Sequence, residues 1–167
     1  KSVSKYFDRI TRPEQILSSL PQAVNTMLDP ADCGPAVISM SQDVQGEAYD
    51  YPEIFFEEKI HEIRRIHPDP NQIQKAADKL KQSKQPIIIS GGGVLYSEAE
   101  EEISAFAKKH NIPVTATVMG IGCMNKDDPY YISAIGCLGE GSSNNLATDT
   151  DLALAVGTKL GDFTTGS

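Results

Sequence analysis

The spacing of hydrophobic positions along the chain changes near residue 70. Before that point, apolar residues from Ile16 to Leu28 recur every three or four positions, as on one buried face of a helix. The sequence therefore predicts a helix over residues 13–28, kinked or divided at Pro21, which lacks a backbone donor. The apolar run Ala36–Met40 has the length of a buried strand and predicts one.

A segment with little periodicity follows, over residues 45–70. It carries four aromatic residues among acidic ones and ends in a Pro-Asp-Pro sequence. Because a packed domain rarely contains so long a loop without regular structure, we expect residues 51–69 to link two domains.

After residue 70 the pattern alternates between helix and strand. Asp69 and Pro70 are typical of a helix start, and a helical stripe from Ile73 to Leu80 follows them. Strands are predicted at 86–90, 112–118 and 152–156, and helices from about Ser97 to residue 110 and over 142–148. This order predicts an α/β fold with a parallel, doubly wound, Rossmann-like sheet. Three strands are few for such a sheet, so we expect the chain to be a piece of a longer protein.

The charge of the chain narrows the classes of partner. Fifteen Lys and Arg against 23 Asp and Glu give 167 residues a net charge of −8, which argues against nucleic-acid binding. The longest apolar runs are too short to cross a bilayer, so no membrane association is expected. The three cysteines are widely spaced, as is typical of reduced thiols, and predict a cytoplasmic location.

Glycines cluster where the predicted strands end. Gly91, Gly92 and Gly93 follow the strand at 86–90 and lie before a helix, so their backbone could approach a nucleotide or diphosphate closely. The match to G-x-G-x-x-G is poor because Tyr96 stands where the last glycine belongs. A tight crossover turn that needs glycine is the alternative. Further glycines, Gly120, Gly136 and Gly157, follow later strands, and Met119 stands directly before the first of them. They predict either one shared crevice or ordinary turns.

No catalytic or metal-binding constellation is evident from the residues. Adjacent carboxylates such as Glu57-Glu58 point in different directions and predict solvated surfaces. The three histidines share no helical face with cysteine or carboxylate pairs at metal-ligand spacing. An NAD-dependent enzyme would need a histidine beside the glycines, and the only one near them, His110, is placed to cap a helix C-terminus.

The chain resembles thiamine-diphosphate enzymes of the acetohydroxyacid synthase type. The resemblance rests on an ordered series of segments that covers most of the chain: 34–37, 42–44, 91–94, 112–115, 119–122 and 151–157. It implies a three-domain parent, in which residues 1–50 are the C-terminal tail of the pyrimidine-binding domain, 51–69 a linker and 70–167 a truncated central domain. The family's activating glutamate would lie upstream and its magnesium motif downstream. The resemblance thus implies that this segment is structural, with no catalytic residue and no metal ligand.

Three segments, 5–15, 45–52 and 162–167, resemble the branch of this family that hydrolyses a ring C–C bond in inositol breakdown. For the parent, this implies attack of the thiazolium carbanion on a cyclic diketone, C–C cleavage and hydrolysis to 5-deoxy-glucuronate. The implied cofactors are thiamine diphosphate and Mg²⁺, bound mainly outside this segment. The implied assembly is a homo-oligomer, either dimer or tetramer.

Some members of the family bind FAD in the central domain. The positions that match their flavin site are Gly92, Gly93, Met119, Gly120, Gly136 and Gly157. However, Cys137-Leu138 stands in the turn that carries histidine in the synthase, and Lys159 replaces an arginine, which removes a planar bidentate contact. FAD is therefore not expected. The alternative function, an FAD- or ADP-binding module of a synthase-like carboligase, would use these same residues.

Overall fold

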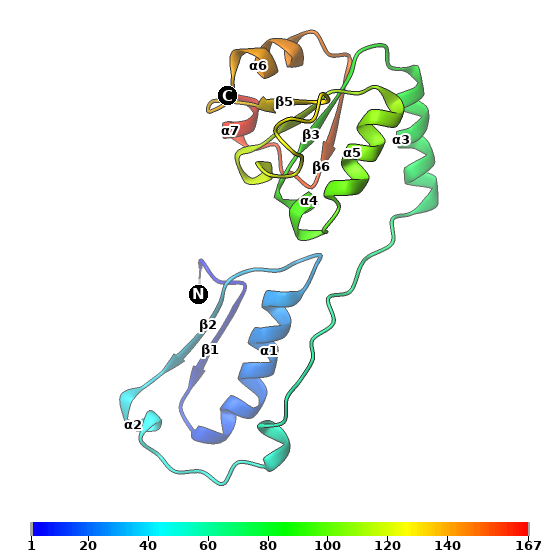
Figure 1. The fold of residues 1–167 in the computed structure, drawn as a ribbon. Coiled ribbons are helices and arrows are strands. Elements are labelled where there is room, and N and C mark those ends of the chain that lie inside the picture. Colours follow the sequence, from blue (N-terminus) through cyan, green and yellow to red (C-terminus); the bar gives the residue numbers. More distant parts are fainter. Residues whose placement is uncertain (1, 167) are drawn as a thin grey trace. The chain divides into compact units, whose positions relative to one another are not determined.

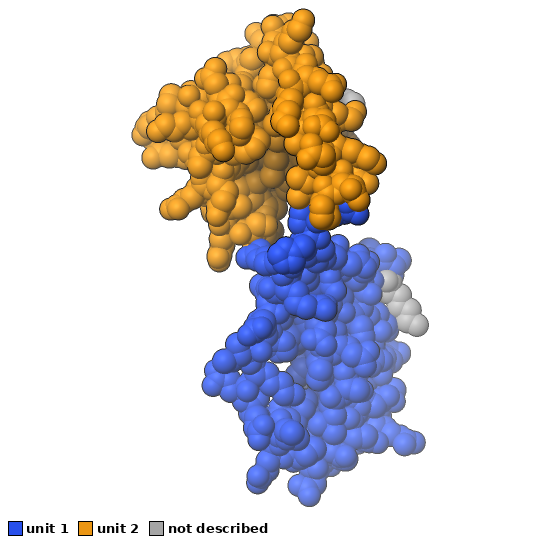
Figure 2. Space-filling view, turned by 90° about the vertical axis from the view of Figure 1, so that its right-hand side faces the viewer, with its two compact units in different colours: residues 1–69 blue, residues 70–167 orange. Residues whose placement is uncertain are grey.

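The chain divides into two compact units, residues 1–69 and 70–167, coloured separately in Figure 2. The computed structural model describes residues 2–166; Lys1 and Ser167, the end residues of the first and last predicted segments, lie outside this part. The boundary between the units falls where α3 begins (Figure 1). Residues 51–69, predicted as a linker, group with the first unit. Their assignment, and that of residues 1–50 to a pyrimidine-binding domain, stays a prediction.

The first unit is a β-α-β arrangement. Strands β1 (Tyr6–Ile10) and β2 (Ala36–Met40) pair in parallel, with Tyr6 opposite Ala36 and Ile10 opposite Met40. A short 3-10 turn, η1 (Pro13–Gln15), leads into α1 (Ile16–Leu28), which connects the strands. The predicted helix and strand are confirmed, but α1 continues through Pro21, so the predicted division is wrong. The sequence pattern also missed β1, because its two charged residues, Asp8 and Arg9, obscure the apolar run.

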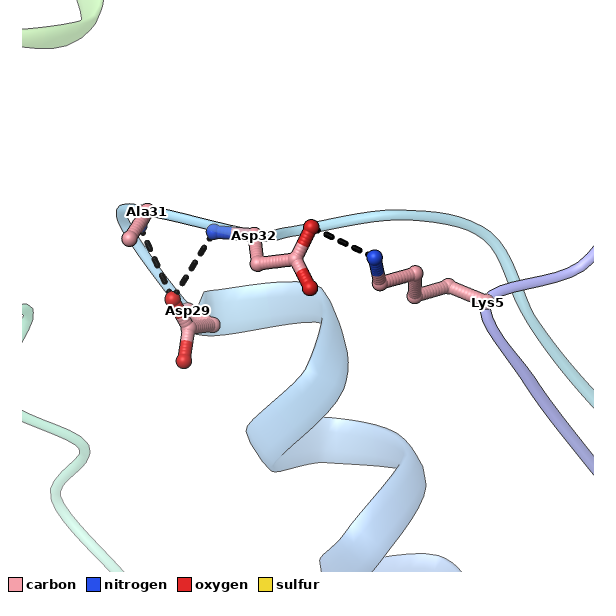
Figure 3. Close-up of polar contacts among 4 residues, drawn as sticks. All are labelled: Lys5, Asp29, Ala31 and Asp32. Atoms are coloured by element: carbon pink, nitrogen blue, oxygen red, sulfur yellow. Dashed lines mark hydrogen bonds and ion pairs between the residues drawn. The ribbon is translucent and has the colours of Figure 1, made fainter.

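Polar side chains fix both ends of α1. At its start, Gln15 Oε1 accepts hydrogen bonds from the backbone amides of Thr11 and Arg12 at 2.7 and 3.0 Å. At its end, Asp29 Oδ1 accepts from the amides of Ala31 and Asp32, at 2.8 and 3.0 Å (Figure 3). Lys5 forms an ion pair with Asp32, which ties this turn to the residue before β1. These contacts orient α1 against the two strands.

The remainder of the first unit contains two short elements, α2 (Gln42–Gln45) and η2 (Glu53–Phe55). Tyr51 anchors η2, because its hydroxyl donates to the carbonyl oxygen of Pro13 at 3.2 Å. Residues 57–69 have no helix or strand.

The second unit contains a four-stranded parallel sheet in the order β5-β4-β3-β6. Its strands are β3 (Pro86–Ser90), β4 (Val114–Ala116), β5 (Tyr131–Ala134) and β6 (Leu152–Val156). The helices are α3 (Pro70–Gln82), α4 (Gly92–Tyr96), α5 (Glu100–His110), α6 (Gly141–Thr148) and α7 (Asp162–Thr165). The predicted parallel α/β fold is confirmed.

Three local expectations need correction. The strand predicted over 112–118 is only β4, since the 3-10 turn η3 (Val118–Gly120) follows at once. A helix starts at Gly92, directly after the first glycine, and not near Ser97; a second helix begins at Glu100. The sequence pattern did not indicate β5, which is a short edge strand with a register shift against β4.

Alternate residues of β3 build two core layers. Ile88 belongs to a buried cluster with Ile103 and Ala107 of α5, and the partly buried Leu80 of α3 packs against it. Ile87 and Ile89 form a second cluster with Ile135, against which α6 packs. Because successive side chains of a strand point to opposite faces, α3 and α5 cover one face of the sheet and α6 covers the other (Figure 1).

The strand order places a topological switch beside β3. The chain runs from β3 to β4 and β5 on one side, then returns to β6 on the other side of β3. In open α/β sheets, ligands bind beyond the carboxyl ends of the strands at such a point. Within residues 2–166, no helix is long and apolar enough to cross a membrane.

Candidate functional site: a crevice beyond the carboxyl ends of β3 and β6

A cavity of about 570 Å³ lies at this switch point. Segments that follow β3, β4 and β6 line it together with the start of α7. Four of the six residues predicted for a binding site line this crevice: Gly92, Gly93, Met119 and Gly157. The structure thus brings together residues that are up to 65 positions apart in the sequence, from Gly92 to Gly157.

The other two predicted residues do not line the crevice. Gly120 is buried behind it, against the end of β3. Gly136 lines a separate cavity of about 700 Å³, beside α6. There the Asn144 side chain accepts from the Gly136 amide at 2.9 Å and donates to its carbonyl oxygen at 3.1 Å. No observation tests whether any of the six residues binds a ligand, so that assignment stays a prediction.

Close backbone packing explains why glycine stands at several of these positions. A Cβ on Gly93 would lie 2.6 Å from Gly157 Cα, and one on Gly157 would lie 2.7 Å from Gly93 Cα. Gly157 also has a φ of +61°, a conformation that favours glycine. A Cβ on Gly120 would lie 2.3 Å from the carbonyl oxygen of Ser90. Thus the alternative of tight turns accounts for these glycines without a ligand.

Backbone hydrogen bonds lock the loops that form the crevice. The Gly91 amide donates to Val156 O at 2.8 Å, and the Gly93 amide donates to Gly157 O at 2.9 Å. On the other side, the Thr117 amide donates to Ser90 O at 2.8 Å. The crevice walls are therefore preformed by contacts between loops.

The side chains of the crevice offer contacts but no acid-base pair. Met119, Leu138 and Phe163 are exposed apolar side chains, while Lys159 is the one charged residue in the lining. The lining contains no histidine, cysteine or carboxylate. Sequence reasoning missed Phe163 and Thr164 of α7 as lining residues; the signal was their position a few residues after β6.

The titratable groups with a shifted pKa lie outside the crevice. Burial raises the pKa of the Cys123 thiol and of the Tyr131 hydroxyl, so both stay protonated near neutral pH. Hydrogen bonds, from Ser19 for the first and from Ser83 for the second, lower the pKa of the Asp8 and Asp151 carboxyls. The two carboxyls tie structural elements together, since Asp8 links β1 to α1 and Asp151 links the start of β6 to the segment before β3. In the described part of the chain, no three His, Cys, Asp or Glu residues are placed to hold a metal ion.

Comparison with known proteins identifies relatives over the whole chain. All 167 residues match 3D-(3,5/4)-trihydroxycyclohexane-1,2-dione hydrolase of Clostridium perfringens (strain 13 / Type A) at 45% identity. The protein of the same name from Bacillus subtilis (strain 168) is 44% identical over the same length. In each case the match covers 100% of this chain and 26% of the relative, so the chain spans about a quarter of the length of these proteins.

Solved structures share the fold at lower identity. Benzoylformate decarboxylase from Polynucleobacter necessarius superposes with a TM-score of 0.73 and 23% identity, over 92% of this chain and 28% of that one. The thiamine diphosphate-dependent 4-hydroxybenzoylformate decarboxylase of Rhodococcus jostii RHA1 gives a TM-score of 0.75 and 21% identity, over 96% and 30% of the two chains. These likenesses establish the fold.

The family follows from a separate match. Residues 73–167, more than half of the chain, match the model of the thiamine pyrophosphate enzyme central domain. This range includes β3–β6 and the loops of the crevice. The resemblance found in the sequence is therefore confirmed: the chain belongs to the thiamine pyrophosphate enzyme family, whose central domain it carries in residues 73–167.

Proposed function

We propose that this chain is a scaffold segment of a thiamine-diphosphate-dependent hydrolase that cleaves a C–C bond of trihydroxycyclohexane-1,2-dione to give 5-deoxy-glucuronate. The observation that carries the proposal is the 41–45% identity to hydrolases of that name over all 167 residues. This identity extends through residues 1–72, outside the range of the family model. The alternative, an FAD- or ADP-binding module of a carboligase, is not favoured by these relatives.

Thiamine diphosphate would supply the carbanion chemistry that breaks the C–C bond. Its diphosphate is commonly bound with a divalent cation, and Mg²⁺ prefers an octahedral set of oxygen ligands that includes carboxylates. The crevice lining has no carboxylate, and no metal-ligating cluster exists among the described residues. The described residues thus do not fit the metal ion that accompanies the diphosphate. In the proposal, the cofactor and the metal ion both bind mainly outside this segment.

The proposed contribution of this chain is rigidity. The loops after β3, β4 and β6 are joined by backbone hydrogen bonds and by glycine contacts that leave no room for a Cβ. A sheet with its loops locked in this way holds neighbouring parts of an enzyme at a fixed separation. The proposal also includes a cytoplasmic location, a homo-oligomeric state and a cyclic diketone as the small-molecule substrate, with no nucleic-acid or membrane partner.

The test is a ring-cleavage assay on the protein that the complete gene encodes, with and without thiamine diphosphate and Mg²⁺. We expect turnover only when both are present, and none from the 167-residue chain alone. A complete protein that leaves the trihydroxycyclohexanedione intact while decarboxylating a 2-oxo acid would overturn the substrate assignment. Turnover by the 167-residue chain would overturn the scaffold role.

A further inference from the structure

One wall separates the crevice from the second cavity, the space of about 700 Å³ beside α6. We define this wall as residues 160–165, which comprise Leu160, Gly161 and the helix α7. Leu160 and Thr164 line both spaces, whereas Phe163 lines the crevice and Asn144 lines the second cavity. A shift of the wall would therefore widen one space and narrow the other, so the contacts that hold the wall set the width of the crevice.

The wall packs on the turn that follows β5, residues 136–139 (Figure 1). The Cys137 amide donates a hydrogen bond to the carbonyl oxygen of Phe163 at 2.8 Å. A Cβ on Gly136 would overlap that same oxygen and would lie 2.8 Å from Thr164 Cα. Gly136 also has a φ of +94°, which favours glycine. The backbone of the wall thus occupies the space that a side chain at position 136 would need.

The Asn144 side chain reaches this turn from α6. Its amide oxygen accepts from the Gly136 amide and its amide nitrogen donates to the Gly136 carbonyl oxygen, so one side chain pairs with both polar groups of that residue. Two bonds to the same residue fix the orientation of the turn as well as its distance from α6. The end of β5 is a second support for the turn, because the Glu140 amide donates to Ala134 O at 3.1 Å.

We propose that Asn144 is a positioning residue of the crevice. It holds the 136–139 turn, and the turn in its place holds α7 and the Phe163 carbonyl. The loops after β3 and β6 differ, since they are joined directly by backbone bonds such as that from the Gly93 amide to Gly157 O. The α7 wall is therefore the part of the crevice that a single side-chain substitution can release. This inference goes beyond the proposed function and does not depend on the reaction.

Hydrogen exchange, followed by mass spectrometry of peptides from the protein that the complete gene encodes, tests this role. Three segments are compared: the turn with Glu140, the wall, and β3. In Asn144→Ala, exchange should become about 10- to 100-fold faster in both the turn and the wall, the change expected when two hydrogen bonds are lost. Exchange in β3 should not change, because β4 and β6 pair with it on both sides.

Two further variants make the comparison specific. Asn145→Ala is the matched control, because Asn145 is the next residue of α6 and is exposed. The group of Asn145 that Thr148 contacts, at 2.7 Å, is its backbone carbonyl, which alanine retains. This variant should leave exchange unchanged in all three segments. Gly136→Ala acts on the other side of the same joint, where the new Cβ displaces Phe163 O, and it should speed exchange in the wall while Asn144 is intact.

Each outcome decides for or against the positioning role. Faster exchange in the turn alone would show that other contacts hold α7, and unchanged exchange in both segments would show that the end of β5 supports the turn; either result overturns the proposal. Faster exchange that includes β3 would make Asn144 a residue of the general fold, which also overturns it. A wall that keeps its protection in Gly136→Ala contradicts the proposed joint. Faster exchange confined to the turn and the wall in Asn144→Ala, with the control unchanged, supports the proposal.

Discussion

Adding one methyl group at Gly120 should severely destabilise the second unit. Its Cβ would lie 2.3 Å from Ser90 O and 2.9 Å from Gly91 Cα. Both neighbours are backbone atoms, and Ser90 O already accepts a hydrogen bond from the Thr117 amide at 2.8 Å. Neither atom can move away without separating η3 from the end of β3.

Overpacking of this kind costs about 1–3 kcal/mol, and backbone neighbours place Gly120→Ala near the upper end, at about 3 kcal/mol. For a unit of this size, each kcal/mol lowers Tm by about 4–8 °C, so we expect a decrease of about 12–24 °C. Thermal unfolding followed by circular dichroism measures it, and urea unfolding gives the free energy directly.

The matched control is Gly141→Ala at the first position of α6. No atom lies within 4 Å of a Cβ built there, and its φ is in the ordinary negative range. This variant should gain about 0.4–1 kcal/mol, because alanine restricts the unfolded chain and fits the helix. If Gly120→Ala loses less than about 1 kcal/mol, less than any overpacked core site, the loops are not locked as described.

Three further changes test the packing around the site. Ile88→Ala removes a core side chain that is 1% exposed and should cost about 2–5 kcal/mol in urea unfolding; a loss below about 1 kcal/mol would mean that the sheet is not packed against α5. Asp151→Asn should lower Tm at neutral pH, because the Asp151 carboxylate accepts hydrogen bonds from Ser83 and from the backbone before β3. These bonds lower its pKa from 3.8, so the stabilisation is present above that pH and is lost as pH falls through the folded-state pKa; a difference between wild type and variant that persists in strong acid would contradict this. Of the three cysteines, the exposed Cys33 and Cys137 should react with a thiol reagent in the native chain, whereas buried Cys123 should react only after unfolding; native labelling of all three, read by mass spectrometry, would refute the burial of Cys123.

The sequence by itself determined the main elements where the pattern is periodic or continuous. Helix α1 and the strands β2, β3 and β6 follow from it, and α3 begins at Pro70 as its capping residues predict. Their alternation was sufficient to predict a parallel sheet. The ordered motifs also identified the family, which is confirmed by the match over residues 73–167.

The sequence pattern did not predict the elements that lack a continuous or periodic apolar run. β1 includes adjacent charges, and β5 has four residues, so each depends on pairing with a neighbouring strand. The end of β4 at Ala116 was also unpredictable, because Thr117 and Val118 are good strand formers. In the structure Thr117 is the N-cap residue of the 3-10 turn η3, and Val118 is its first residue.

The packing that requires glycine at these positions was decided only by the tertiary structure. In the sequence, Gly93, Gly120 and Gly157 are compatible both with a ligand cradle and with tight turns, since glycine serves each. The fold shows why each position requires glycine, because it brings backbone atoms from other loops to 2.3–2.7 Å from the Cβ that each position lacks; ligand binding by the crevice stays a prediction. Sequence determines where a chain can turn, whereas the space around each turn depends on segments that are distant along the chain.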